Sequence, residues 1–300
     1  MSDFEAADDG VAFTITVLTD TGPGELAGVL ESIARDIAPH AAVVHLTHDV
    51  EPYDVRGGSL ALARAIGYVA SGVVVAAVDP DTDRPIVAVE LAGASGVLIG
   101  PDNGLLAPAV AMAGGAGRAF VLDNADYHLE SPGSVLAVRD VMMSAAAHLA
   151  CGVPLEVLGT SVDTSNLLPG ILPITRSEAD ALAAEVLWVD RYGAIQLNVG
   201  TDELETNAGD RVLIRFGDTA RTALVTTSVR GLGESQLALV PDAYGLMSLR
   251  LCRGSAAADL GLGVADAVSL TVVGPGNAPG LDGSFPDMTG GTITPVQLRR

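Results

Sequence analysis

The sequence predicts an α/β domain with a doubly wound, largely parallel sheet, followed by a small antiparallel β-barrel domain. Two patterns indicate this fold class. In the first half, apolar β-branched runs alternate with amphipathic helical patterns, as in strand–helix–strand units of a parallel sheet. In the second half, short apolar runs follow one another between turn residues, which favours a barrel or sandwich. Hydrophobic residues make up 49% of the chain and aromatic residues 4%, so we expect cores of Ala, Val, Leu and Ile.

The elements of the first domain follow in regular order. A helix is expected over residues 24–39, where Leu26, Leu30, Ile33 and Ile37 recur at helical spacing before Pro39. A second helix is expected over 54–69, and a third after the Gly-Pro-Asp-Asn-Gly turn at 100–104. The expected strands are residues 12–20, 41–50, 72–79, 85–91 and 96–100.

Polar residues mark the ends of four of these strands. They are Asp20, His48-Asp49, Asp79 and Asp102-Asn103. Ligands of such sheets bind beyond the carboxyl ends of the strands. A collection of carboxylates at that edge suits a cationic or polyhydroxyl ligand better than a phosphate. At the last of these ends, we favour a role for Asp102 and Asn103 in shaping the corner over a role in contacting the ligand.

The predicted domains are residues 12–165 and 176–274, joined by a Pro- and Ser/Thr-bearing connector and followed by a mobile Gly/Pro-rich tail at 275–300. The short strands of the second domain are expected at 185–190, 194–199, 211–216, 222–229, 237–242, 246–251 and 267–273. No internal repeat is expected.

Charge and motifs exclude several functions. The net charge is −21 and all 16 basic residues are Arg, which disfavours nucleic-acid and membrane-surface partners. Cys151 and Cys252 fit neither a metal spacing nor a disulfide framework. No signal peptide and no apolar run of 18 residues is visible, so we expect a soluble cytoplasmic protein.

Two further patterns are weak. The glycines at 22, 24 and 28 follow a strand but are one residue too widely spaced for a dinucleotide fingerprint. His45 and His48 lie three apart on a predicted strand, so we expect their side chains on opposite faces and no shared metal ion.

Four blocks carry a family resemblance. THDVEPYDVRGGSLALARA, VVVAAVDPDTDRPIVAVE, GVLIGPDNGLL and NADY resemble, in order and spacing, the S-adenosyl-L-methionine (SAM) hydroxide adenosyltransferase family, a relative of SAM-dependent fluorinases and chlorinases. VDRYGAIQLNV and RGSAAADLGLGVADAV resemble the opening and closing segments of the family's second domain. The resemblance spans residues 12–273. It implies a homotrimer that binds SAM, as substrate and without another cofactor, between one chain's first domain and a neighbour's second.

The implied chemistry is attack of water on ribose C5′ of SAM, which gives adenosine and L-methionine. Asp79 and Arg84 match two residues that position the water in the family, and an Asp at the first position resembles the hydrolases rather than the halogenases. The family's third residue, a His, is replaced by Ala137, although Arg139 and Asp140 match. His128 is a possible substitute, but the sequence does not show that it can reach.

The resemblance also implies substrate-binding residues. These are Asp20 at the ribose, Tyr53 as a ring in EPYD, Asp190 near the methionine and Tyr192 near the adenine. Ala27 and Ala194 stand where the family has Tyr and Asn. Glu25 stands where the family has its second acidic residue. Three functions therefore stay open: a hydrolase, an adenosyltransferase that uses a halide or another small nucleophile, and a non-catalytic SAM-binding protein.

Overall fold

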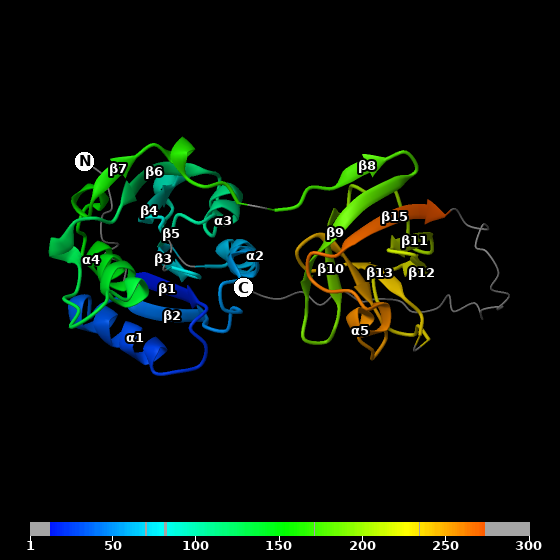
Figure 1. The fold of residues 1–300 in the computed structure, drawn as a ribbon, viewed down its shortest axis with the longest axis horizontal. Coiled ribbons are helices and arrows are strands. Elements are labelled where there is room, and N and C mark those ends of the chain that lie inside the picture. Colours follow the sequence, from blue (N-terminus) through cyan, green and yellow to red (C-terminus); the bar gives the residue numbers. More distant parts are fainter. Residues whose placement is uncertain (1–12, 70, 81–82, 171, 234, 274–300) are drawn as a thin grey trace, which may run out of the picture. The chain divides into compact units, whose positions relative to one another are not determined.

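A computed structural model describes residues 13–273, with gaps at 70, 81–82, 171 and 234 (Figure 1). The predicted tail at 275–300 lies outside the described residues. The chain divides into two compact units between Leu172 and Pro173, and each is described by itself.

The first unit is built on a seven-stranded sheet in the order β2-β1-β3-β5-β4-β6-β7. Its strands are β1 (Thr14–Thr19), β2 (Ala42–Thr47), β3 (Gly72–Ala77), β4 (Ile86–Leu91), β5 (Val97–Pro101), β6 (Ala116–Val121) and β7 (Thr160–Val162). β2, β1, β3 and β5 pair in parallel, whereas the β5–β4, β4–β6 and β6–β7 pairs are antiparallel. Five strands therefore run one way and two the other, which confirms the prediction of a largely parallel α/β sheet.

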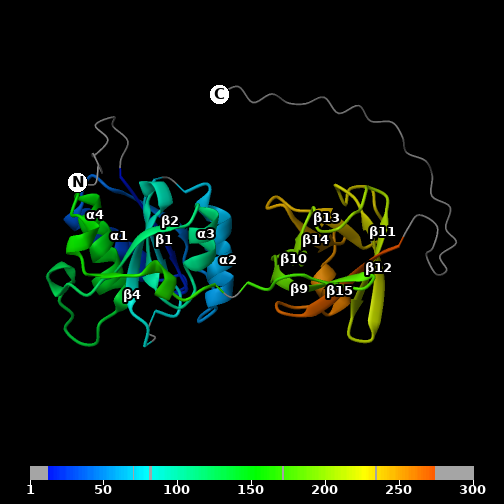
Figure 2. The same ribbon diagram turned by 90° about the horizontal axis from the view of Figure 1, so that it is seen from above.

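Helices cover both faces of this sheet (Figures 1 and 2). α1 (Leu26–Ile37) and α4 (Ser144–Ala150) lie on one face, and α2 (Val55–Ile66) and α3 (Ala107–Met112) lie on the other. Because side chains alternate along a strand, β3 contributes to two cores: Val73 and Val75 to one cluster, Val74 to the other. The sheet is thus doubly wound, as predicted.

Short helical segments connect these elements. They are η1 (Ala92–Ala94), η2 (Ala125–Tyr127), the π-helix η3 (Val138–Met143), η4 (Leu155–Val157) and η5 (Thr164–Asn166). η3 runs directly into α4, so the first unit's last long helical segment begins with a wider turn.

The second unit is a β-barrel. Its strands are β8 (Arg176–Glu178), β9 (Ala181–Val189), β10 (Ile195–Gly200), β11 (Arg211–Phe216), β12 (Thr219–Val225), β13 (Ala238–Pro241), β14 (Leu246–Arg250) and β15 (Ala267–Val273), with helix α5 at Ala256–Leu260. The β10–β9 pair closes seven strands into a ring, and β8 extends β9. Ile195, Leu197, Val212 and Ile214 belong to its core. The barrel is confirmed, but it is not wholly antiparallel because β12 and β13 pair in parallel.

Within the described residues, no helix is long and apolar enough to cross a membrane.

Candidate active site

The carboxylate of Asp20 contacts two other predicted site residues, Tyr53 and Asp79, at the carboxyl edge of the sheet. Asp20 follows β1, and its Oδ2 accepts hydrogen bonds from the backbone N–H of Tyr53 (3.2 Å) and of Asp79 (3.1 Å). These donors lie 33 and 59 residues further along the chain. The parallel pairing of β2, β1 and β3 brings their following loops to one edge, as predicted. One carboxylate oxygen thus assembles the loops that carry Tyr53 and Asp79.

Both donor residues have an unusual backbone conformation. φ is +65° at Tyr53 and +47° at Asp79, in the left-handed region that residues with a Cβ rarely adopt. Such conformations cost roughly 1–3 kcal/mol each and persist where surrounding contacts impose them, often at functional sites. The two bonds to Asp20 are contacts of that kind. The Tyr53 ring is 77% exposed, so its position does not follow from core packing.

Asp79 is held by its backbone, and its side chain is left available. Its carbonyl oxygen accepts a hydrogen bond from Asn103 Nδ2 (3.2 Å), which also bonds the carbonyl of Val78 (3.0 Å). In the described part of the chain, the Asp79 carboxylate makes no hydrogen bond or ion pair. Asn103 therefore shapes this corner, and the half-buried Asp79 carboxylate can accept a proton or a hydrogen bond from a ligand.

Arg84 is anchored on Asp102, at the end of β5. Its Nε donates to the backbone oxygen of Asp102 (3.0 Å), and its Nη2 forms an ion pair with the Asp102 carboxylate. The Arg84 side chain is 42% exposed, whereas that of Asp102 is 7% exposed. The contacts of Asp102 and Asn103 support our interpretation that they shape the corner.

The position that holds His in the resembling family lies at the start of η3. Ala137 is half-buried and packs against the core, and the following Val138 is fully buried. Asp140 accepts hydrogen bonds from Leu136 N–H (2.8 Å) and from Arg139 Nε (2.5 Å). Burial of the Asp140 carboxyl raises its pKa, but these hydrogen bonds outweigh burial and hold the pKa below its ordinary value. The matched Arg139-Asp140 pair therefore stabilises the fold of this segment.

His128, the residue considered as a substitute for the missing histidine, lies at the end of η2. Its ring makes no hydrogen bond to Asp79 or Arg84 within the residues described. Its backbone N–H donates to Ala125 O (3.1 Å), which closes the turn of η2.

The expectation that the side chains of His45 and His48 lie on opposite faces was wrong. His45 Nδ1 and His48 Nε2 are 2.8 Å apart, because the pairing of β2 with β1 slips by one residue between His45 and Thr47, which breaks the two-residue alternation of side chains. His48 Nδ1 in turn bonds Thr19 Oγ1 (2.8 Å), and His45 Nε2 lies 3.5 Å from Glu31. Burial lowers the pKa of His48, and the adjacent His45 lowers it further. Among the described residues, no group of three or more His, Cys, Asp or Glu side chains could hold a metal ion.

In the second unit, Asp190 and Tyr192 lie in one tight turn between β9 and β10. Asp190 Oδ1 accepts from the N–H groups of Tyr192 (2.9 Å) and Ala194 (2.8 Å). Asp190 Oδ2 has no hydrogen-bond partner among the described residues, and Tyr192 is 79% exposed. One carboxylate oxygen therefore builds the turn while the other can bind a ligand.

The same turn occurs a second time. Asp-Ala-Tyr-Gly at 242–245 repeats Asp-Arg-Tyr-Gly at 190–193, and Asp242 Oδ1 accepts from Tyr244 N–H (2.7 Å) and Leu246 N–H (3.1 Å). φ is +79° at Gly193 and +80° at Gly245. The sequence thus contains a short local repeat that we did not expect. The two turns differ at Oδ2, because Asp242 uses this oxygen to bind Gln196 Nε2.

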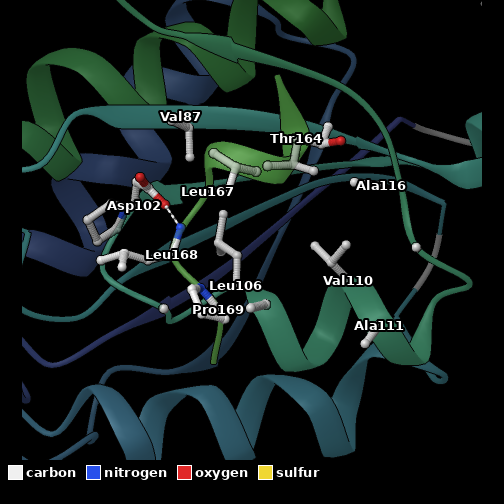
Figure 3. Close-up of a pocket in the computed structure, with 15 residues that line it drawn as sticks. Val87, Asp102, Leu106, Val110, Ala111, Ala116, Thr164, Leu167, Leu168 and Pro169 are labelled. Carbon is white, nitrogen blue, oxygen red and sulfur yellow. Dashed lines mark hydrogen bonds between the residues drawn. The ribbon is translucent and has the colours of Figure 1, made fainter. Parts of the chain in front are cut away.

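A cavity of about 350 Å³ lies beside Asp102, between β4, α3 and the segment 164–169 (Figure 3). Its lining is mostly apolar and includes Leu106, Val110 and Leu167. Asp20, Tyr53 and Asp79 do not line this cavity, so we place the candidate site at the carboxylate edge.

Comparisons with known proteins agree with these features. Residues 15–159 match the model of the SAM hydroxide adenosyltransferase N-terminal domain, and residues 184–269 match that of the C-terminal domain. The chain is 39% identical over 193 residues to the (R)-S-adenosyl-L-methionine hydrolase of Salinispora tropica, covering 64% of this chain and 74% of that protein. It is 26% identical over 232 residues to a fluorinase of Actinopolyspora mzabensis, covering 69% of this chain and 72% of that protein.

A solved structure is also similar. The crystal structure of an uncharacterized conserved protein from Thermotoga maritima has a TM-score of 0.78 and 27% sequence identity. The match covers 86% of this chain and 99% of that one. The match therefore includes parts of both units of the present chain.

Proposed function

The chain belongs to the SAM hydroxide adenosyltransferase family, and on this premise we propose that it is a SAM hydrolase that forms adenosine and L-methionine. The observation that carries the proposal is the junction at Asp20, where one carboxylate oxygen holds the backbones of Tyr53 and Asp79 at the sheet edge. The Asp79 carboxylate makes no hydrogen bond or ion pair with the described residues and is therefore available to a ligand. SAM is the substrate, and the proposed reaction needs no other cofactor.

The reaction places modest demands on the protein. A water oxygen forms a bond to ribose C5′ while the C5′–S bond breaks, and its electron pair leaves on sulfur. Sulfonium thereby becomes the neutral thioether of methionine, so the leaving group needs no proton. The water loses one proton, which the Asp79 carboxylate can accept. The main task is therefore to hold the water in line with C5′ and to orient its lone pair.

We assign the residues accordingly. Asp79 and Arg84 are the catalytic residues: the carboxylate orients and deprotonates the water, and the guanidinium fixes its position. Asp20 binds the ribose hydroxyls through the carboxylate that also organises the loops, and Tyr53 supplies an exposed ring beside it. The excess of negative charge, −21 over the chain, favours a cationic substrate over a phosphorylated one.

Asp190 and Tyr192 complete the site from a neighbouring chain in the assembly we propose, a cytoplasmic homotrimer. The unpartnered Asp190 Oδ2 suits the ammonium group of the methionine moiety, and the exposed Tyr192 ring suits the adenine. A light-scattering mass of about 91 kDa, three times the 30.4 kDa chain, is the expected result. A mass of one chain at micromolar concentration would contradict the trimer.

A second function is favoured by one observation. Ala137 stands where the family's water-using pattern has His, so this position carries no polar side chain that could hold the water. Without that polar group, water is bound less strongly, so another nucleophile can compete with it for the site. One relative of the chain is a fluorinase. Adenosyl transfer to a halide or another small nucleophile is therefore the alternative.

One experiment separates these functions. Purified protein is incubated with SAM in H₂¹⁸O, alone and with chloride, fluoride, a small thiol or a small amine, and the products are resolved by mass spectrometry. The hydrolase gives adenosine with ¹⁸O at the 5′ position, and Asp79→Asn abolishes most of it. Asp36→Asn, a change at an exposed carboxylate near the end of α1, is the control and keeps activity. A 5′-substituted adenosine formed only with an added nucleophile indicates the alternative, and binding without turnover indicates a non-catalytic SAM-binding protein.

A further inference from the structure

Asp102 is a buried carboxylate whose two oxygens are both engaged. Oδ2 accepts from Arg84 Nη2, and Oδ1 accepts from the backbone N–H of Leu168 at 2.8 Å (Figure 3). The backbone of Asp102 is fixed as well, since its N–H donates to Pro85 O (2.9 Å) and its O accepts from Arg84 Nε (3.0 Å). Three of these contacts thus fix Asp102 against the loop that carries Arg84, and the fourth joins it to the segment that carries Leu168.

This arrangement restricts the guanidinium of Arg84. An ionised carboxylate is costly to bury without partners, so the contacts to Arg84 and Leu168 cannot be given up without a large penalty. A guanidinium that donates through Nε and Nη2 to one residue is fixed in direction as well as in distance. The neighbouring Asn103 holds the Asp79 carbonyl from the same turn. The turn therefore contacts both residues that we assign to catalysis.

We propose that Asp102 is a positioning residue for hydrolysis: it sets the Arg84 guanidinium relative to the Asp79 carboxylate. The inference rests on the proposed function of this site. Asp102 does not touch the substrate in this role and acts through Arg84. Its loss lowers kcat and changes the KM for SAM little, because the ribose and methionine contacts belong to other residues.

The same sheet contains a matched pair for comparison. Glu90 on β4 binds Arg118 on β6 through Nε (2.7 Å) and Nη2 (3.1 Å). The carboxylate side chains are 11% exposed at Glu90 and 7% at Asp102, and the arginine side chains are 43% and 42% exposed. Glu90 pairs with Val97 at the start of β5, whereas Asp102 follows the end of that strand. The Glu90 pair therefore has the same burial at the opposite edge, away from the site.

The test measures adenosine formation from SAM by two variants of Asp102. Asp102→Asn keeps the size of the side chain and an acceptor for Leu168 N–H but removes the charge that holds Arg84. Asp102→Glu keeps the charge and moves it by one methylene, for which the adjacent 350 Å³ cavity has room. We expect both to lower kcat about 10- to 100-fold, the effect of a misplacement of about 1 Å, with KM changed less than about threefold. Glu90→Gln is the control and changes kcat less than about threefold, and thermal unfolding of each variant confirms folding.

A double mutant identifies the route of the effect. In an Arg84→Ala background, Asp102→Asn lowers kcat no further if Asp102 acts through Arg84. An independent additional loss in that background, or wild-type kcat in either folded Asp102 variant, would overturn the inference while leaving the hydrolase intact. Absence of adenosine with the wild-type protein would instead overturn the proposed function, and this role with it.

Discussion

Replacing Asp20 with alanine tests the central junction of the candidate site. The change removes the acceptor of the Tyr53 and Asp79 backbone N–H groups, which lie on two different loops. No other side chain in the described residues accepts from either N–H. We therefore expect Asp20→Ala to reduce both the stability of the first unit and the affinity for SAM.

The magnitude follows from the two hydrogen bonds. A typical bond contributes about 0.5–1.5 kcal/mol net, and a bond to a charged group about 1.5–3 kcal/mol. Asp20 is half-buried, so about 1–1.5 kcal/mol for each bond gives a loss of about 2–3 kcal/mol. Relaxation of Tyr53 and Asp79 out of their left-handed conformations returns part of this free energy. The expected net decrease in the free energy of unfolding is about 1–2 kcal/mol.

The loss of SAM affinity is expected to exceed the loss of stability. Relaxation of the two loops stabilises the free protein, but the conformation that binds SAM must then be restored on binding. Together with the lost ribose contact, this gives a weakening of roughly 1.5–3 kcal/mol, or about 10- to 150-fold in Kd.

Urea unfolding followed by circular dichroism and calorimetric titration with SAM measure the two quantities. Asp20→Asn keeps one acceptor oxygen and is expected to lose less stability than Asp20→Ala. Asp36→Ala, at an exposed carboxylate near the end of α1, is the control. Unchanged unfolding and unchanged SAM affinity in Asp20→Ala would refute the reasoning and remove Asp20 from the site.

The remaining predictions concern other parts of the chain. Ala137→His is expected to raise kcat for hydrolysis, by up to about 10²–10⁴-fold if the ring reaches the water; an unchanged kcat in a folded variant would contradict a role of this position in holding the water. Burial lowers the pKa of both His48 and His148, so the unfolded chain binds protons that the folded protein does not. Stability is then fully present above pH 6.5, the ordinary histidine pKa, and decreases as the pH falls below it; urea midpoints measured from pH 7.5 to 5.5 check this, and a flat series would contradict it. In the barrel, an added Cβ would lie 1.9 Å from the nearest side-chain atom at Gly193, whereas Gly245, with almost the same φ, has open space. Gly245→Ala is expected to cost about 1–2 kcal/mol for the left-handed conformation alone, and Gly193→Ala at least about 1 kcal/mol more; equal melting temperatures would disprove the steric argument.

The sequence predicts most of the elements because their signals are local, although the strands β6, β7 and β8 were not predicted. Both long helices of the first half and the short strands of the second follow from the spacing of apolar residues within one element. The direction of a strand is set by its partners, and no residue of β4 indicates that it runs antiparallel to β5. For the same reason the parallel β12–β13 pair was not predicted. The contact between His45 and His48 was missed because a strict two-residue strand period was assumed, whereas the register of β2 against β1 shifts between His45 and Thr47.

The candidate site was predicted only as a set of residues and not as an arrangement. The family resemblance identified Asp20, Tyr53 and Asp79 one by one, yet the bonds that join them run from backbone N–H groups, which every residue except proline carries. No side-chain pattern records such bonds, so the junction at Asp20 becomes visible only in the folded chain. The repeated Asp-x-Tyr-Gly turn shows the opposite case, since its signal was present in the sequence and its structural role could have been derived.

Comparison of the two turns also shows which oxygen of Asp190 stabilises the turn and which is available to a ligand. Both turns need an Asp, because Oδ1 accepts two backbone N–H groups in each. The second oxygen distinguishes them: that of Asp242 binds Gln196, and that of Asp190 has no partner in the described residues. If each carboxylate served only its turn, asparagine at either position would leave SAM binding unchanged. If Asp190 also binds the cationic methionine moiety, Asp190→Asn weakens SAM binding while Asp242→Asn leaves it unchanged, although both variants keep the turn.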